Sequence, residues 1–247
     1  MIRTLLACLL LALPAQALSS FAQDDRDAPY VPTPQTTVDG MLDIAAIQPG
    51  ELLIDLGSGD GRIPISAGRR GARAIGIDNN SALIARANYK AREASVADRV
   101  RFRREDLFTT NVRDADVVTL YLLPEINLQL RPRLLTEMKP GARIISHAFD
   151  MGDWLPDRFE RVDDRRVYLW IVPAIAGGEW RMTLADGSTQ PLVLDQRYQK
   201  LSGTLGGAVL SNVTLSGDRL SFAVGNTAYS GRVGYTAIVG DGWRAVR

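Results

Sequence analysis

Residues 55–61, Asp55-Leu56-Gly57-Ser58-Gly59-Asp60-Gly61, form a glycine-rich stretch at the end of the short apolar run 51–56. An apolar run of this length that stops at turn residues predicts a buried strand. Alternate glycines after a strand predict a tight turn in which the backbone comes close to a ligand, and a following helix presents free N–H groups there. The stretch therefore predicts the first strand and the ligand loop of an α/β fold.

Strand-like and helix-like segments alternate around this stretch. Apolar positions at helical spacing predict helices over residues 35–46 and 81–93 and from Pro124 to about Lys139. Short apolar runs predict further strands over residues 72–77, 100–104, 116–121, 142–146 and 166–172, the last paired with a strand over 159–162. Such alternation is typical of a mostly parallel sheet covered on both faces. We therefore predict a Rossmann-like, seven-stranded α/β sheet.

The pattern changes after the junction at 174–178. Residues 177–247 show no helical period, and short alternating runs appear at 180–184, 192–194, 220–224 and 235–239. Residues 185–188 and 216–218 are typical of hairpin turns. This part of the chain predicts a small C-terminal antiparallel β domain, either a barrel or a curled sheet.

The composition excludes several classes of protein and site. With 247 residues, 46% of them hydrophobic and 23% charged, the chain has ordinary globular composition, which excludes a disordered chain and a multi-span membrane protein. Lys plus Arg (29) nearly balance Asp plus Glu (28), so no basic field favours nucleic acid as a partner. Cys8 and His147 are the only residues of their kinds, so we expect neither an intramolecular disulfide nor a metal site.

The first 22 residues have the layout of a secretory signal peptide. A singly positive start precedes the apolar run 5–13, and cleavage signals follow at 15–17 and 20–22. A spanning helix needs roughly 20 apolar residues, which this stretch does not supply. We expect an exported, periplasmic protein, with an uncleaved N-terminal membrane anchor as the alternative.

The glycine loop does not fit a dinucleotide. A nicotinamide or flavin site favours the spacing G-x-G-x-x-G with a small third residue, whereas Arg62 stands in that place. The Asp55 carboxylate beside the loop suits a cationic or amine-bearing ligand better than a pyrophosphate.

Two further acids follow the next two strands. Asp78 directly follows the strand over 72–77, where a carboxylate can accept hydrogen bonds from both hydroxyls of a ribose. Asp106 follows the strand over 100–104, where an acid beside apolar groups can hold an adenine amino group. With Asp55, these acids lie at the carboxyl ends of strands, where open α/β sheets bind ligands.

This combination resembles the class I S-adenosylmethionine-dependent methyltransferases over roughly residues 30–173. The resemblance implies S-adenosylmethionine as the cofactor. It assigns the glycine loop, a ribose-binding pair and an adenine-binding pair to the cofactor site: Asp55, Gly57, Ser58, Gly59 and Gly61; Asp78 and Asn79; Asp106 and Leu107.

Narrower features resemble one branch, the small lysine methyltransferases that modify ATP synthase subunit c and the adenine nucleotide translocase. These are the segments 29–34, 60–63 and 122–124. The resemblance implies a protein lysine as acceptor, and members of this branch carry a hydrophobic N-terminal segment and act on membrane proteins. The chain departs from the branch at Asp78, where glutamate is common, and in having residues 177–247.

The methyl acceptor is expected just past the fourth strand, near Tyr121, Glu125 and Asn127. We predict that Tyr121 and Glu125 contact it, since a lysine must lose a proton before it attacks and a carboxylate or hydroxyl could relay that proton. S-adenosylmethionine is a cytosolic compound, so the alternative is an exported, non-catalytic protein that binds a nucleoside-like ligand or a protein.

Simpler structural roles stand beside these assignments. Asp78 could cap the helix from Ser81, and Asp106 could be a turn acid. We expect His147 to be a structural or rim histidine. The four tryptophans, Trp154, Trp170, Trp180 and Trp243, are expected to pack in a core or at the junction.

Overall fold

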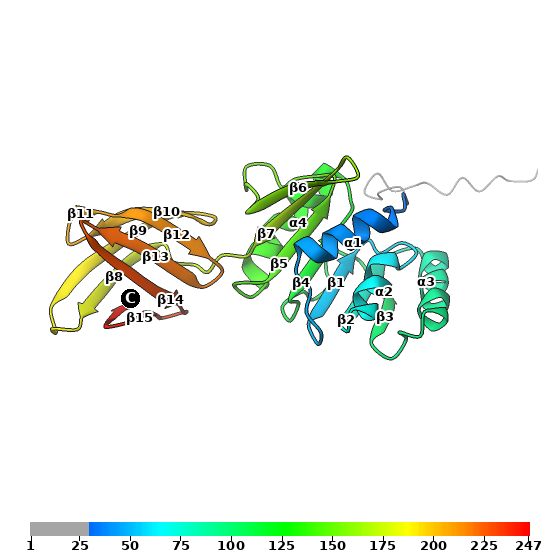
Figure 1. Ribbon diagram of the computed structural model, residues 1–247, viewed down its shortest axis with the longest axis horizontal. Helices are drawn as coiled ribbons and strands as arrows, with labels where there is room; N and C mark the ends of the chain where they lie inside the picture. The colour runs from blue at the N-terminus through cyan, green and yellow to red at the C-terminus, as the bar shows by residue number, and fades with distance from the viewer. Residues whose placement is uncertain (1–29) are drawn as a thin grey trace, which may run out of the picture.

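The computed structural model describes residues 30–247, which form two parts that follow one another along the chain (Figure 1). Each part is built on one β-sheet. The predicted signal peptide over residues 1–22 lies outside the described residues. Among the described helices, none combines the length and apolar character needed to cross a membrane.

The first part contains four helices and a seven-stranded sheet. Its helices are α1 (Gln35–Ile44), α2 (Arg62–Arg69), α3 (Ser81–Glu93) and α4 (Pro124–Glu137). Its strands are β1 (Leu52–Leu56), β2 (Arg73–Asp78), β3 (Val100–Arg104), β4 (Val117–Leu120), β5 (Arg143–His147), β6 (Arg158–Val162) and β7 (Arg165–Ile171). The order in the sheet is β3-β2-β1-β4-β5-β7-β6, with β1 to β5 parallel and β7 antiparallel to both of its neighbours.

Helices cover both faces of this sheet. Successive β1 residues point to opposite faces, so that Leu53 belongs to the core under α1, α2 and α3, whereas Ile54 belongs to the core under α4. The α1 side chains Val38, Met41 and Leu42 are fully buried in the first core, as their helical spacing predicts. Pro124 begins α4, where the missing N–H of proline is tolerated.

The chain changes direction across the sheet between β1 and β4. From β1 it first moves outward through β2 to β3, and then returns to β4 on the other side of β1. In sheets of this kind, ligands bind at the carboxyl ends of the strands where the order reverses. The glycine loop after β1 and Tyr121 after β4 therefore lie at the expected binding edge.

The second part is a nine-stranded antiparallel sheet in the order β11-β10-β9-β8-β16-β15-β14-β13-β12. Its strands are β8 (Gly178–Leu184), β9 (Thr189–Arg197), β10 (Lys200–Leu205), β11 (Ala208–Val209), β12 (Ser211–Ser216), β13 (Arg219–Val224), β14 (Thr227–Val233), β15 (Ala237–Gly240) and β16 (Trp243–Val246). The sheet curls around a core of its own that includes Leu192, Phe222 and Ile238. The predicted fold class, an α/β sheet followed by a small antiparallel β domain, is confirmed.

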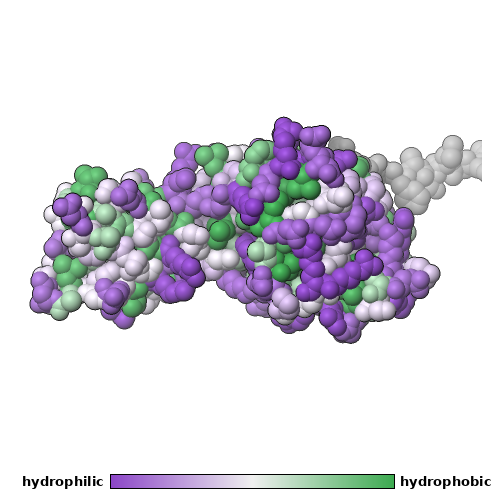
Figure 2. Space-filling view, in the orientation of Figure 1, coloured by the Kyte–Doolittle hydropathy of each residue, from purple (hydrophilic) through white to green (hydrophobic). Residues whose placement is uncertain are grey.

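The two parts meet across a narrow waist, which Figure 2 shows between two bodies with mixed polar and apolar surfaces. The four tryptophans pack in the cores as predicted: Trp154 and Trp170 in the first part, and Trp180 and Trp243 in the second. Their exposed fractions are 0–6%, so none is available as an open cage for a cation.

Candidate active site

The glycine loop makes a tight turn between β1 and α2. Gly57, Gly59 and Gly61 all have positive φ, at 82°, 53° and 82°. The N–H groups of Gly57 and Ser58 donate to the carbonyl of Ile77 at 2.9 and 2.8 Å, and that of Gly61 donates to Ser58. These N–H groups already have protein acceptors, so the loop is not a phosphate cradle. The geometry agrees with the rejection of a dinucleotide from the sequence.

Asp78 joins the glycine loop to the N-terminal end of α3. One carboxylate oxygen accepts the Gly59 N–H at 2.9 Å, and the other accepts the Asn80 N–H at 2.9 Å. A carboxylate offers about four lone-pair positions, so both oxygens keep capacity for ribose hydroxyls. The suggestion that Asp78 caps α3 is wrong. Asn80 is the cap, because its side chain accepts hydrogen bonds from Ala82 and Leu83.

Asp55 is buried beneath the loop with an exposed fraction of 2%. The Thr119 hydroxyl donates to its carboxyl group at 2.6 Å. The pKa of Asp55 is raised to about 7, chiefly by burial; the Thr119 hydrogen bond acts against this rise, and the charges of Asp78 and Asp60 add to it. A cationic ligand next to this acid would favour its charged form.

Asp60 explains why Arg62 stands where a dinucleotide site needs a small residue. The Arg62 guanidinium donates to both Asp60 oxygens at 2.8 and 2.9 Å, and the Lys90 ammonium forms a second ion pair with the same carboxylate. Burial opposes the charge of Asp60, but these hydrogen bonds and cations hold its pKa well below the usual range. Sequence reasoning missed this network because Lys90 lies 30 residues away on α3.

The segment from Tyr30 to Pro34, here called the N-terminal segment, lies against the glycine loop. A Cβ atom added to Gly59 would stand 2.6 Å from the Tyr30 ring. Arg62 also donates to the Thr33 carbonyl at 2.5 Å. Part of this segment carried the resemblance to the lysine methyltransferases, which was the signal that could have pointed to it.

The two predicted adenine-binding residues lie in the turn after β3. The Asp106 carboxylate is exposed and accepts the Phe108 N–H at 2.8 Å, which is the geometry of a turn acid. Leu107 is half-buried and packs with Phe108 beside the core under α4. Asn79, predicted beside the ribose, is exposed, and its carbonyl accepts a hydrogen bond from Arg104. Adenine contact by Asp106 and Leu107 stays a prediction.

The predicted acceptor residues lie just past the carboxyl end of β4. Tyr121 is half-buried, with its ring centroid 3.9 Å from that of His147. Glu125 is exposed in the first turn of α4. Asn127 is buried instead, and it donates to Ser146 and to the carbonyls of Phe149 and Asp150, which fixes the loop after β5.

His147 is buried rather than at a rim, with an exposed fraction of 1%. The Thr33 hydroxyl is 3.2 Å from its Nδ1 atom. Burial lowers the pKa of His147 to about 4, and the Arg165 charge lowers it in the same direction. The imidazole is therefore neutral at physiological pH.

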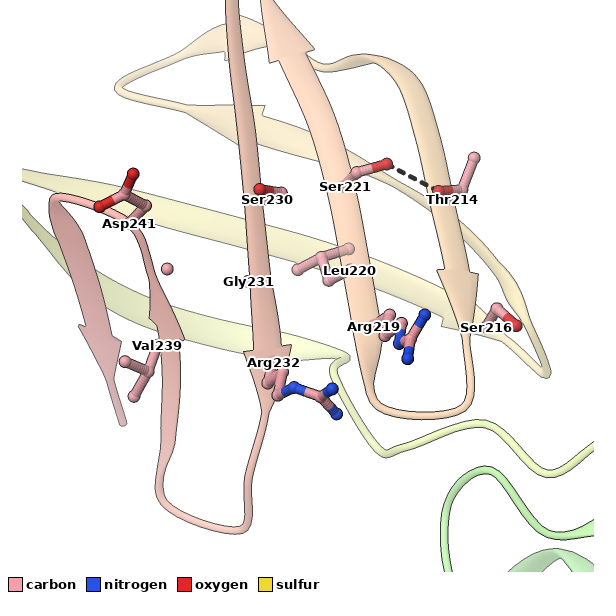
Figure 3. Close-up of a pocket in the computed structure, with 11 residues that line it drawn as sticks. Thr214, Ser216, Arg219, Leu220, Ser221, Ser230, Gly231, Arg232, Val239 and Asp241 are labelled. Carbon is pink, nitrogen blue, oxygen red and sulfur yellow. Dashed lines mark hydrogen bonds between the residues drawn. The ribbon is translucent and has the colours of Figure 1, made fainter.

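A surface pocket lies in the second part, away from the glycine loop (Figure 3). Its volume is about 600 Å³, and it is lined by polar and apolar residues of β12 to β15, among them Thr214, Arg232 and Val239, and by Asp241 just after β15. The residues with nucleoside-binding chemistry stand instead around β1, β2 and β4, so we place the candidate site there. Within residues 30–247, no three His, Cys, Asp or Glu residues group as a metal site would require.

Comparisons with known proteins match the first part of the chain. The family model described as the ANTKMT methyltransferase domain matches residues 55–158. A protein-lysine N-methyltransferase from Saccharolobus islandicus is 36% identical over 150 residues, which are 58% of this chain and 93% of that protein. The chain belongs to this family of S-adenosylmethionine-dependent methyltransferases.

Two other relatives agree on methyl transfer but differ in acceptor. The mouse adenine nucleotide translocase lysine N-methyltransferase is 35% identical over 129 residues. The matched region is 52% of this chain and only 56% of that relative. A crystal structure described as an RNA methyltransferase from Salinibacter ruber, with bound S-adenosyl-L-homocysteine, has 49% identity. It covers 57% of this chain and 94% of its own, with a TM-score of 0.57. These comparisons give no support to a non-catalytic binding protein.

S-adenosylmethionine is the cofactor of this enzyme, and the residues present fit it. Asp78 lies at the junction of the glycine loop and α3 with free acceptor capacity, and Asp55 offers a buried carboxyl group to a cationic ligand. The N–H groups of the loop are hydrogen-bonded within the protein, so the loop backbone can approach a nucleoside and needs no phosphate as an acceptor.

Proposed function

We propose that the enzyme methylates the side-chain nitrogen of a protein lysine. The observation that carries this proposal is the 36% identity across 93% of the Saccharolobus islandicus protein-lysine N-methyltransferase. The net charge supports it, because a formal net charge of only +1 gives no general attraction for RNA. The exposed carboxylate of Glu125 at the carboxyl end of the sheet suits a cationic acceptor.

We propose that the cofactor is held by Asp55, the loop Gly57–Gly61 and Asp78, with Asn79, Asp106 and Leu107 toward the nucleoside. Asp78 lies at the end of β2 beside the loop, the position of a ribose acid. Bound S-adenosylmethionine supplies a methyl group on a positively charged sulfur. The protein's main task is then to position the acceptor in line with that group and to exclude water.

A lysine ammonium must lose its proton before its nitrogen can form the new bond to the methyl carbon, while the carbon–sulfur bond breaks and its electron pair stays on sulfur. We expect the Glu125 carboxylate to attract the ammonium and to receive or relay the proton, and Tyr121 to supply a hydroxyl and a ring surface to the acceptor. These assignments rest on their positions just after β4 and in the first turn of α4.

The test is transfer of a labelled methyl group by the full chain to protein and RNA acceptors in parallel. Membrane and soluble protein fractions, total RNA and unmodified peptides containing lysine would be incubated with methyl-labelled S-adenosylmethionine. We expect methyl-lysine by mass spectrometry, and its loss in Asp78→Ala. Label only in RNA would contradict the lysine acceptor and support the Salinibacter ruber description.

Tyr121 and Glu125 should act on transfer rather than on cofactor affinity. We expect the double variant Tyr121→Phe, Glu125→Gln to reduce kcat by at least about 100-fold, in the range typical of lost acid–base groups. Its dissociation constant for S-adenosylmethionine, measured by calorimetry, should stay within a few-fold of wild type. Unchanged turnover would remove both residues from the acceptor site.

We infer that the protein is exported, or held at a membrane by residues 1–22, because these residues have the composition of a signal peptide. A reporter fused after Gln23 separates the possibilities. Recovery of a cleaved reporter in the periplasm is expected. An uncleaved, membrane-bound reporter would favour tethering, and a cytosolic reporter would contradict both.

A further inference from the structure

His147 ends β5 directly beside the predicted acceptor site, and sequence reasoning gave it only a structural role. Its side chain is buried, yet it faces a tyrosine predicted to contact the acceptor. It is also the chain's single histidine. Two contacts, from segments far apart in the sequence, define its surroundings.

The first contact is with Tyr121. The two ring centroids are 3.9 Å apart and the planes are tilted by 34°. Since Tyr121 follows the last residue of β4 and His147 is the last residue of β5, both rings lie at the carboxyl edge of neighbouring parallel strands. The imidazole therefore restricts the side-chain positions that Tyr121 can adopt.

The second contact is with Thr33 in the N-terminal segment, 114 residues away. The Thr33 hydroxyl and His147 Nδ1 are 3.2 Å apart. A hydrogen bond to one ring nitrogen fixes the orientation of the ring, and the Thr33 hydroxyl can form it as donor or as acceptor. Because the Thr33 carbonyl accepts a hydrogen bond from Arg62, and Arg62 forms an ion pair with Asp60, the same threonine is also connected to the glycine loop.

The neutral state of the His147 ring suits a positioning role. Burial and the nearby Arg165 charge keep the pKa of His147 low, so its ring adds no positive charge. A neutral ring does not repel a cationic methyl donor or a lysine ammonium, whereas a protonated one would.

We propose that His147 is a positioning residue for methyl transfer, which holds the Tyr121 ring in place while Thr33 fixes the imidazole. Thr33 thereby links the two sides of the site. Its carbonyl contacts Arg62 next to the glycine loop, and its hydroxyl contacts His147 on the acceptor side. This inference deepens the proposed function and rests on methyl transfer to a lysine near Tyr121.

The kinetic test compares two buried threonines of the same region. Thr33→Val removes the hydroxyl group that hydrogen-bonds to His147. Thr37→Val is the matched control, because Thr37 is fully buried and its hydroxyl has no hydrogen-bond partner among residues 30–247. We expect Thr33→Val to lower kcat about tenfold or more with the KM for S-adenosylmethionine within about threefold, since small misplacement of reacting groups is costly. Thr33→Ser should restore the rate, and Thr37→Val should leave it unchanged.

A spectroscopic test does not depend on turnover. In untagged full-length protein labelled with 15N-histidine, His147 gives the one imidazole signal set, and ring-labelled tyrosine reports Tyr121, assigned with Tyr121→Phe. We expect one neutral tautomer near pH 7. Thr33→Val should shift the signals of both His147 and Tyr121, and Thr37→Val neither.

The outcomes separate this inference from the proposed function. If wild type transfers methyl groups but Thr33→Val and His147→Phe turn over normally, the positioning role is wrong and the methyltransferase remains. If wild type methylates no lysine, the proposed function fails, and the nuclear magnetic resonance signals decide whether Thr33 and His147 hold Tyr121. Tyrosine signals unchanged in both variants would overturn the inference in either case.

Discussion

At the scale of single residues, Asp55 is an acid buried away from water. Its carboxyl group is 2% exposed and bonded to Thr119. Burial, and then the negative charges of Asp78 and Asp60, favour the neutral form. This arrangement is unfavourable for the empty protein at neutral pH and becomes favourable when a cationic ligand lies beside the acid.

The pH dependence of stability follows from this shift. The pKa of Asp55 is about 7 in the folded protein, against 3.8 for an ordinary aspartate, so the folded state holds the proton more tightly. The stabilisation that protonated Asp55 gives to the folded state is complete below about pH 4. It is lost as the pH rises to about 7, and the free energy of unfolding changes no further from this group above that pH. We expect Asp55→Asn to raise the free energy of unfolding at pH 8 by up to ~4 kcal/mol, at ~1.4 kcal/mol per pKa unit. Urea unfolding at pH 5 and pH 8 measures the difference, and the variant should bind S-adenosylmethionine more weakly.

Asp116 supplies the opposite control. Although burial opposes its charge, hydrogen bonds from Lys139 and from the Leu52 N–H lower the pKa of Asp116. Its contribution is therefore present at neutral pH and lost on acidification. Asp116→Asn should destabilise the protein at pH 7, and a gain in stability there would contradict the assignment for both acids.

Gly59 is required for two independent reasons. Its φ of 53° is unfavourable for a residue with a side chain, and a Cβ atom would stand 2.6 Å from the Tyr30 ring. We expect Gly59→Ala to lower the free energy of unfolding by ~1–3 kcal/mol. It should also weaken S-adenosylmethionine binding at least about tenfold in calorimetry, because the loop and Tyr30 must move. Gly50→Ala is the control: its φ is also positive, but its Cβ position is open. Equal cofactor affinity in both variants would exclude a role for the Tyr30 contact.

At the scale of elements, the helices and strands of the first part could be predicted because local signals agreed with the fold. Helix α3 was predicted over its observed range, Ser81–Glu93, and β3 over Val100–Arg104. Each has an apolar period and turn residues at its ends. The strand order also explains why acids at three strand ends share one edge.

The second part could be predicted only as a class. Strands β10, β12 and β14 are not predicted, because they contain glycine or alternate small polar residues with few apolar ones, as in Lys200–Leu205. Strands β11 and β16 are not predicted either, and they are only two and four residues long. Their pairing depends on neighbours distant in sequence. The same limit applies to the site, where the contacts Asp60–Lys90 and Thr33–His147 span 30 and 114 residues and leave no trace in local spacing.

The correct cap of α3 can be tested directly. Asn80 accepts hydrogen bonds from the N–H groups of Ala82 and Leu83 at 2.9 and 3.2 Å. We expect Asn80→Ala to cost about 1 kcal/mol of stability in thermal or urea unfolding, whereas Asn80→Asp, which keeps an acceptor, should cost much less. Since Asn80 also donates its N–H to Asp78, the alanine variant retains that bond, and a large loss of cofactor binding would contradict a purely capping role.

At the scale of the whole molecule, the turn between β9 and β10 fastens the second part to the first. Trp154 donates through its indole N–H to the Gln199 side chain at 2.9 Å, and Gln199 donates to the Leu155 carbonyl at 2.7 Å. Tyr198 stacks on Trp154 with ring centroids 5.9 Å apart. Asp153 adds ion pairs to Arg131 of α4 and Arg197 of β9.

This contact lies in the loop that follows His147. The loop begins at the carboxyl end of β5, where Asn127 binds it, and continues to Trp154 beneath the second part. The second part is therefore attached to the same loop that borders the acceptor site. Loosening the attachment should affect stability first, because Trp154 is fully buried and Gln199 satisfies its N–H group.

Gln199→Ala tests this attachment. The variant leaves the Trp154 N–H and the Leu155 carbonyl without their partner, so we expect a loss of ~1–3 kcal/mol in the free energy of unfolding. Because the two parts have separate cores, we also expect a larger radius of gyration in small-angle X-ray scattering and a broader thermal transition. Gln129→Ala, on the exposed side of α4, should change neither. If both variants behaved alike, the Gln199 contacts would contribute nothing, and the ion pairs of Asp153 and the stacked rings would hold the two parts together.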